Sequence, residues 1–275
     1  MCYFYHFKWF YNLYAYIINI IGKFLKQFLY FLIEITIINM NKLKLIAFSD
    51  PHGYLPQDIP NCDIVIIAGD ILPLDIQRDD VKAISWFLLE FKPWAESLNC
   101  DKVIFTAGNH DFLFDHLGPK LGHSASDVMK KLLGNHKKTS KLVYLCNSSY
   151  EYKGRRFFGF PWCPELSNWA FYKSDDDMEK MCEIIPKKCD VLIAHCPPSI
   201  GSTGIVHQPG YNYMTNYGSI RLSEAIIFRD IKWLICGHIH SGNHVPETIN
   251  YTNIVNVSIK DEDYKVNYNL FEFEL

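Results

Sequence analysis

The chain has 275 residues, of which 49% are hydrophobic and 21% are charged, and its formal net charge is −3. This length and balance are typical of one large or two small globular domains, and they exclude wholesale disorder and a polytopic membrane protein. The slightly negative charge comes without a basic tract interleaved with aromatic residues, so we expect no stable binding to nucleic acid.

Residues 1–39 form a hydrophobic extension rich in Phe, Tyr, Ile, Leu and Trp. Lysines and Glu34 interrupt its apolar runs, which are too short to cross a bilayer, and no small-residue cleavage site of a signal peptide is present. Three interpretations stay open: a helix that contacts a membrane surface, a segment that packs against the domain, and a segment outside the working protein. Met40 directly precedes the first predicted strand, so we place the working domain at 40–275.

Apolar runs of strand length alternate with helical spacing along the rest of the chain. Buried strands are predicted from Leu43 and over Ile64–Ala68, Lys102–Ala107, Lys141–Leu145, Val191–Ala194, Trp233–Cys236 and Asn253–Ile259. Helices are predicted over Asp79–Ser97, Asp175–Ile185 and Ser219–Phe228. Pro93 is expected to kink or end the first of these helices. No linker or internal repeat divides this region, which indicates one α/β domain.

Less regular segments lie between these elements. Phe112–Ser140 is expected to be a loop-rich cap with a short helix over Ser126–Leu133, and Gly201–Gly218 a mobile rim. A hairpin is predicted over Tyr150–Gly159, with its turn at Lys153-Gly154. An alternating strand over Tyr264–Leu275 is expected to close the chain.

Five of the predicted strands end in Gly or Pro together with Asp, Asn or His. These polar side chains are Asp50, His52, Asp70, Asn109, His110, His195, His238 and His240. Each one alone is an ordinary turn or surface residue, but no other role explains all five strand ends. In alternating α/β folds, ligands bind at the carboxyl ends of the strands, so we expect these side chains to converge on one site.

Imidazole and carboxylate ligands suit Mn, Fe or Zn, and two such ions can share a bridging carboxylate, for which Asp70 is the expected residue. The nine cysteines are odd in number and scattered without CxxC pairs. Their distribution favours reduced thiols in a cytosol-like compartment, and it disfavours a disulfide framework and a thiolate zinc site. The sequence therefore predicts a two-metal hydrolytic centre.

The order of these motifs resembles the five blocks of the calcineurin-like metallophosphoesterases. The blocks are Asp50-x-His52, Gly69-Asp70, Gly108-Asn109-His110-Asp111, His195 and Gly237-His238-x-His240. A closer resemblance, to the MPPED-type (metallophosphoesterase domain-containing) phosphodiesterases, lies in Gly159–Pro164, Asn168–Phe171 and His195–Pro198. The resemblance implies an α/β fold in which helices flank a two-sheet mixed β-sandwich.

The resemblance also implies a role for each matching residue. The first metal ion is expected on Asp50, His52 and His240, and the second on Asn109, His195 and His238, with Asp70 bridging. His110 is expected to stabilise the transition state or to protonate the leaving oxygen, and Asp111 to orient His110.

The resulting hypothesis is a phosphodiesterase in which a hydroxide bridging two metal ions attacks a cyclic nucleotide or another small diester. A phosphomonoesterase or protein phosphatase ranks lower, because the chain has little extra sequence from which to build a groove for a protein substrate. The alternative from another class is a metal-bound scaffold with weak or no catalysis. Retention of His110 and His238 argues against the scaffold.

Overall fold

The computed structural model describes residues 21–30, 42–120, 140–164, 166–207 and 214–275, and the chain divides into the units Met1–Lys42 and Leu43–Leu275. In the first unit, residues 21–30 form a helix whose side chains are all exposed. None of the helices in these ranges is both long and apolar enough to span a bilayer. Most of 1–39 lies outside the described residues, so its three interpretations remain predictions.

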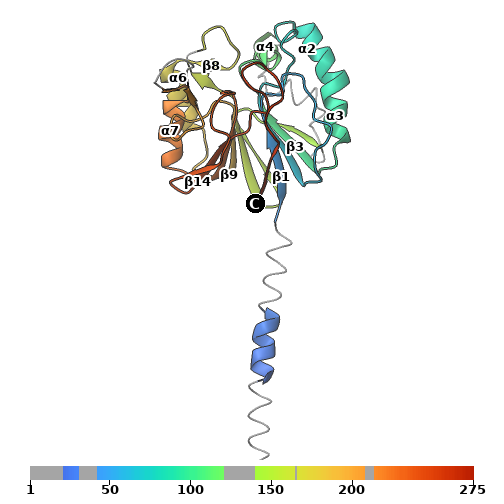
Figure 1. The fold of residues 1–275 in the computed structure, drawn as a ribbon, viewed down its shortest axis with the longest axis vertical. Coiled ribbons are helices and arrows are strands. Elements are labelled where there is room, and N and C mark those ends of the chain that lie inside the picture. Colours follow the sequence, from blue (N-terminus) through green and yellow to red (C-terminus); the bar gives the residue numbers. More distant parts are fainter. Residues whose placement is uncertain (1–20, 31–41, 121–139, 165, 208–213) are drawn as a thin grey trace, which may run out of the picture. The chain divides into compact units, whose positions relative to one another are not determined.

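Two mixed sheets form the centre of the second unit (Figure 1). The first has the order β15-β1-β2-β3-β4 and consists of Phe271–Glu274, Lys44–Phe48, Ile64–Ala68, Lys102–Thr106 and Leu142–Tyr144. The second has the order β13-β14-β12-β9-β6-β5 and consists of Glu247–Ile249, Thr252–Asn256, Asp230–Cys236, Lys188–Ala194, Arg155–Phe160 and Ser148–Tyr152. Strands β1 to β4 are mutually parallel, as are β14, β12, β9 and β6, whereas edge strands β15, β13 and β5 pair antiparallel.

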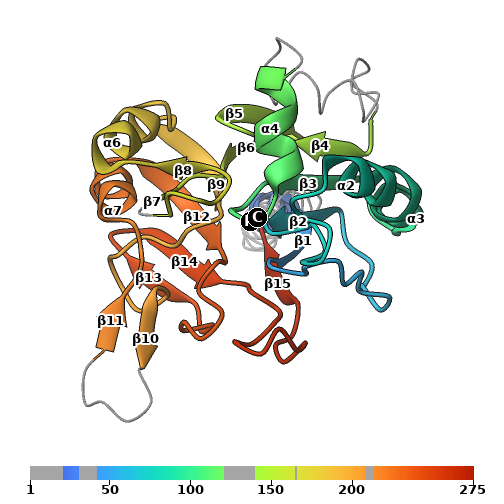
Figure 2. The ribbon, with the colours of Figure 1, turned by 90° about the horizontal axis from the view of Figure 1, so that it is seen from above.

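Helices cover the outer face of each sheet (Figure 2). They are α2 (Asp80–Trp86), the π-helical segment η1 (Phe87–Phe91), α3 (Lys92–Ser97), α4 (Phe112–Lys120), α6 (Asp175–Glu183) and α7 (Ile220–Ile227). Side chains on β2 alternate between the layers: Ile64 and Ile66 pack between the sheets, and Val65 and Ile67 pack under the helices. The result is a helix–sheet–sheet–helix sandwich, which confirms the predicted fold class.

Helices α2, η1 and α3 are continuous from Asp80 to Ser97, so the helix does not end at Pro93. The cap N–H of Lys92 bonds to the Phe87 carbonyl in the wider π-helical pattern, and Pro93 falls in the first turn of α3. Proline has no N–H for the helical ladder, and the change from the π-helical to the α-helical hydrogen-bond pattern falls at this position.

Three irregular segments also differ from their predictions. Phe112–Lys120 is helical rather than loop, because its first turn buries Phe112, Leu113 and Phe114 against the helical layer, while 121–139 lies outside the described residues. The predicted rim contains a small hairpin of β10 (Ile205–His207) and β11 (Met214–Asn216). In the tail, only Phe271–Glu274 is a strand. The hairpin of β5 and β6 is confirmed, with positive φ at Lys153 and Gly154.

Candidate metal centre

The predicted site residues follow the carboxyl ends of five strands, three in the first sheet and two in the second. In the first sheet, β1 leads into Asp50 and His52, β2 leads into Asp70, and β3 leads into Asn109 and His110. In the second sheet, β9 leads into His195, and β12 leads into His238 and His240. The two sheets join directly at this edge, where the Ser49 amide donates to the Val257 carbonyl at 2.8 Å. The fold therefore brings residues from both sheets to one place.

The backbone at this edge is strained at four of the predicted ligands. Asp50, His52, Asp70 and His238 have φ of 56°, 42°, 54° and 68°. Such a left-handed conformation costs a non-glycine residue roughly 1–3 kcal/mol and persists only where surrounding bonds enforce it. Here the amides of Asp50 and His52 donate to the carbonyls of Gly69 and Asp70. The turns that end the strands are thereby locked, with both carboxylates aimed inward.

Two glycines allow the strand ends to approach one another. A Cβ on Gly108 would collide with Asp70 and His195, and a Cβ on Gly237 would collide with Asp50 and its neighbour Ser49. These positions require glycine because side chains of the site occupy the space that any larger residue needs.

The first ligand group consists of Asp50, His52 and His240, whose ligand atoms all lie within 4.8 Å of one another. His240 Nε2 is 3.4 Å from both Asp50 Oδ1 and His52 Nε2. The opposite ring nitrogen, Nδ1, donates to the Asp261 carbonyl at 2.9 Å, so Nε2 is the nitrogen that faces the carboxylate; it donates to Asp50 in the protonated ring and would offer its lone pair to a metal ion once that proton is lost. Asp50 Oδ2 also accepts a hydrogen bond of 2.7 Å from the Ser258 hydroxyl.

The second group is built around Asp70, with His195 and Asp50 as the further members. His195 Nε2 is 3.4 Å from Asp70 Oδ1 and 3.0 Å from Asn109 Oδ1, while its Nδ1 donates to the Ala68 carbonyl at 2.8 Å. Asp70 Oδ2 is 3.8 Å from His52 Nε2, so this carboxylate faces members of both groups. Such a central position suits the bridging role that the sequence predicts.

The carboxylates of Asp50 and Asp70 are ionised although they are almost inaccessible to water. Burial alone would raise the pKa of Asp50, but the hydrogen bond with His240 and the charge of His195 hold it below the usual value. Burial opposes ionisation of Asp70 as well, yet the charges of His195 and His110 keep its pKa well below normal. Two buried carboxylates with imidazole nitrogens directed at them are a donor set that fits divalent metal ions, whose binding would displace the imidazole protons.

Among the predicted histidine ligands, His238 belongs to neither of the two ligand groups that contain Asp50 and Asp70. Its backbone amide donates to Asp50 Oδ2 at 3.0 Å, and its ring centroid is 5.1 Å from that of His195. The ligand atoms that group with its ring nitrogen are the sulfur atoms of Cys163 and Cys196. The ring therefore borders the carboxylate site on one side and a pair of thiols on the other.

His110 lies beside the carboxylates, with Nε2 3.9 Å from Asp70 Oδ2. Its Nδ1 is 2.6 Å from Gln77 Oε1, and its ring packs against Trp169 at a centroid distance of 4.4 Å. No motif points to Gln77, which belongs to the loop after Asp70.

Asp111 makes different contacts from those expected. Its carboxylate accepts the backbone N–H groups of Ile71 and Leu72, both at 2.9 Å, and of Gly108 at 2.8 Å. Asp111 thus ties the loop after β2 to the loop after β3, and the contact to the His110 ring comes from Gln77. The expectation that Asp111 orients His110 directly does not match this geometry.

A cavity of about 570 Å³ opens onto these residues. Its walls are Asp70, Asn109, His110, Val206, Tyr217, His238, Ile239, His240, Ser241, Glu262 and Tyr264. The Tyr264 ring meets the rings of His52 and His240 edge to face, at centroid distances of 5.1 and 5.2 Å. Sequence reasoning placed Tyr264 in a strand and so missed its position at the site.

Comparisons show that the chain is similar to known proteins. The family profile for calcineurin-like phosphoesterases matches residues 42–242, the range that holds every predicted ligand. Metallophosphoesterase domain-containing protein 1 of Homo sapiens is 28% identical over 235 residues, which cover 81% of this chain and 68% of that protein.

Two further similarities were found. A UPF0046 protein of Caenorhabditis elegans is 25% identical over 248 residues, 86% of this chain and 82% of its own length. The crystal structure of phosphopantetheinyl hydrolase from Mycobacterium tuberculosis aligns with 84% of this chain and 95% of that one, at 16% identity and a TM-score of 0.49.

Proposed function

Because the chain belongs to the calcineurin-like phosphoesterase family, we propose that it is a metal-dependent hydrolase of small phosphodiesters. Membership of this family supports the general class of activity, that of a phosphoester hydrolase, and the buried Asp and His residues support metal binding. The preference for diesters and the presence of two metal ions are our proposals. The observation that carries them is the buried carboxylate of Asp70, which lines one cavity with His110 and shares a ligand group with the buried carboxylate of Asp50.

The chain's own residues divide between two ion positions. Asp50, His52 and His240 would hold one ion; Asn109 and His195 would hold the other, joined by His238 after a rotation of its ring, and Asp70 would lie between the two. Bound ions such as Mn, Fe or Zn would neutralise charge on the phosphoryl group and lower the pKa of a water molecule. The αL turns and glycines described above hold the protein ligands in place before any ion arrives.

His110 is positioned to handle a proton at the leaving oxygen. The Gln77 side-chain oxygen accepts the Nδ1 hydrogen, which fixes the ring and leaves Nε2 directed toward Asp70 and the cavity. A protonated Nε2 can donate to the leaving group as the ester bond breaks, and in the neutral form it can accept a proton. Trp169 covers one side of this ring and limits its rotation.

The cavity favours a diester over a monoester. A phosphodiester carries one negative charge, whereas a monoester is close to a dianion at neutral pH. Among the described residues that line the cavity there is no Lys or Arg, and Glu262 adds a carboxylate. The volume of about 570 Å³ is typical of a site for small molecules, which argues against a protein phosphatase.

The test uses the full chain, stripped of metal and reloaded with Mn²⁺. We expect metal-dependent cleavage of bis-p-nitrophenyl phosphate to exceed that of p-nitrophenyl phosphate, to be abolished by Asp70→Ala and to fall about 10²–10⁴-fold in His110→Ala. Faster cleavage of the monoester would favour the phosphomonoesterase. Bound metal without turnover of either ester would favour the scaffold.

A further inference from the structure

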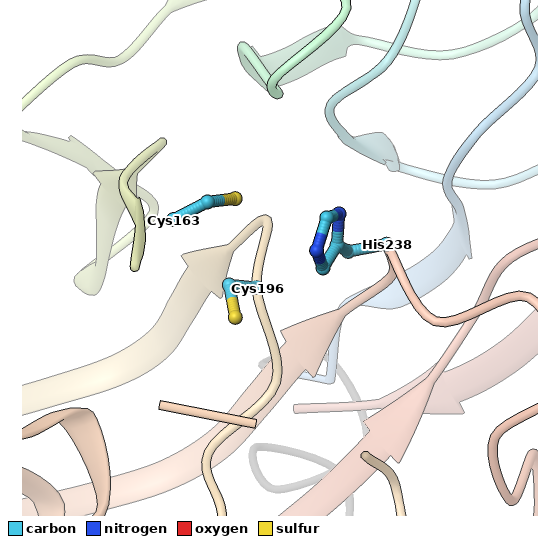
Figure 3. A group of neighbouring side chains, drawn as sticks. All are labelled: Cys163, Cys196 and His238. Atoms are coloured by element: carbon cyan, nitrogen blue, oxygen red, sulfur yellow. The ribbon is translucent and has the colours of Figure 1, made fainter. Parts of the chain in front are cut away.

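Two buried cysteines lie beside His238, and neither belongs to the ligand groups formed by Asp and His residues. Cys163 comes from β7 (Cys163–Pro164), Cys196 follows β9, and His238 follows β12. Figure 3 shows the Cys163 side chain extending toward His238, with Cys196 on the loop between them. The two sulfur atoms and a ring nitrogen of His238 all lie within 4.8 Å of one another. Nothing in the proposed hydrolysis uses either thiol.

The chemistry of this trio differs from that of the carboxylate groups. Two thiolates and one imidazole are soft or borderline ligands, which select Zn²⁺, Cd²⁺ or Cu⁺ over the hard ions that prefer oxygen. The scattered sequence positions of the cysteines argued against a thiolate site, but folding brings residues 163, 196 and 238 together. Because the thiols come from different elements, no CxxC spacing announces them.

Two cavities reach the edge of this group of ligands. His238 lines both the cavity of about 570 Å³ and a second one of about 710 Å³, which also borders Pro164, the residue after Cys163. The side chains of Cys163 and Cys196 are 0% and 1% exposed, so small movements of the loops would have to admit the ion.

We propose that Cys163, Cys196 and His238 form a binding site for a thiophilic d¹⁰ metal ion, separate from the Asp and His groups. Binding releases the two thiol protons to solvent and leaves two metal–sulfur bonds and one metal–nitrogen bond. A fourth position stays open to water, or the ion is three-coordinate.

Occupation of this site also inhibits hydrolysis, a consequence that rests on the proposed function. An ion held by the thiols fixes the His238 ring away from Asn109 and His195. The second hydrolytic ion then loses one of its predicted ligands, so the thiol site and the hydrolytic centre compete for one imidazole.

The test begins with Cd²⁺ binding to the full chain in a Cys100→Ser background. That background removes a second thiol pair, Cys62 and Cys100, whose side chains interact with each other. We expect a thiolate-to-cadmium absorption band that reaches its limit at one equivalent and is lost in Cys163→Ser and in Cys196→Ser. Cys182→Ser, which changes a thiol on the buried face of α6, is the matched control and keeps the band.

Absence of the band from the Cys100→Ser protein, or its persistence in both site variants, would overturn the proposed site. If a site variant does not fold, ¹¹³Cd NMR of the Cys100→Ser protein decides. A resonance in the sulfur-ligated range, beside those of oxygen and nitrogen sites, supports the proposal. Its absence refutes it.

The inhibition has its own measurement. In Mn²⁺-loaded protein, with each variant compared with its own activity before Cd²⁺ is added, we expect half-inhibition by Cd²⁺ to need about tenfold more ion in Cys163→Ser than in Cys182→Ser. Equal sensitivity would refute the competition for His238. If the protein shows no phosphoesterase activity, the proposed function is refuted, but the absorption band can still appear. The two proposals therefore fail separately.

Discussion

Gln77 and His110 are joined by a 2.6 Å contact between the Gln77 Oε1 atom and the His110 Nδ1 atom. The accepting oxygen requires the hydrogen on Nδ1, so it sets which ring nitrogen faces the cavity. A neutral amide does this without the negative charge that a carboxylate partner would bring. Gln77 is therefore a positioning residue for the proposed proton transfer.

We predict that Gln77→Leu lowers kcat for diester hydrolysis about 10–100-fold, because His110 loses the partner that orients it. Gln77→Glu keeps an acceptor at the same place and should retain more activity. The loss in Gln77→Leu should be greater for diphenyl phosphate than for bis-p-nitrophenyl phosphate, since the poorer leaving group depends more on a donated proton.

The control for this prediction is a double-mutant cycle. In a His110→Ala background, Gln77→Leu should have little further effect on kcat. If the two losses multiply instead, Gln77 acts independently of His110 and the positioning role is wrong.

The sequence predicted the strand ends well because their geometry follows from simple rules. Parallel strands place their carboxyl ends at one edge, so the strand pattern alone could bring Asp50 and Asp70 together in the first sheet, and His195 and His238 in the second. The contacts of Gln77 and Tyr264 could not, because both residues belong to irregular segments whose paths depend on tertiary packing. Asp111 shows a related limit: its motif position was clear, but its partners are backbone amides that no motif reports.

Asp111 gives a prediction about stability. Asp111→Ala leaves the buried N–H groups of Ile71, Leu72 and Gly108 without their acceptor, at a cost of roughly 1–3 kcal/mol for each unsatisfied donor. For a domain of this size, each 1 kcal/mol lowers Tm by about 2–4 °C. Thermal unfolding of the metal-free protein measures the change.

Asp177→Ala is the matched control, because Asp177 is exposed in the first turn of α6 and its side chain pairs with Lys180. Its Tm should change little. A Tm for Asp111→Ala that equals the control's would contradict the proposed link between the loops after β2 and β3.

Ser258 gives a prediction about metal affinity. Its hydroxyl donates to Asp50 Oδ2 at 2.7 Å and so fixes the direction of a proposed ligand. Removing such an outer partner typically weakens metal binding 10–100-fold, and we expect a loss of this size in Ser258→Ala when Mn²⁺ binding is titrated calorimetrically. Ser97→Ala, at an exposed helix end, should bind Mn²⁺ as the unchanged protein does.

The number of bound ions tests the shared role of Asp70. Metal analysis after reloading should give two ions per chain, and Asn109→Ala should keep the ion held by Asp50, His52 and His240 while losing the other. Asp70→Ala should weaken both, since the carboxylate of Asp70 faces both groups.

Each ion that binds only the folded state raises stability, by about 2.7 kcal/mol at a hundredfold excess over Kd, so chelation should lower the Tm of the unchanged protein. The same chelation should leave the Tm of Asp70→Ala almost unchanged. One ion per chain, or an equal fall of Tm in both proteins, would show that Asp70 does not bridge.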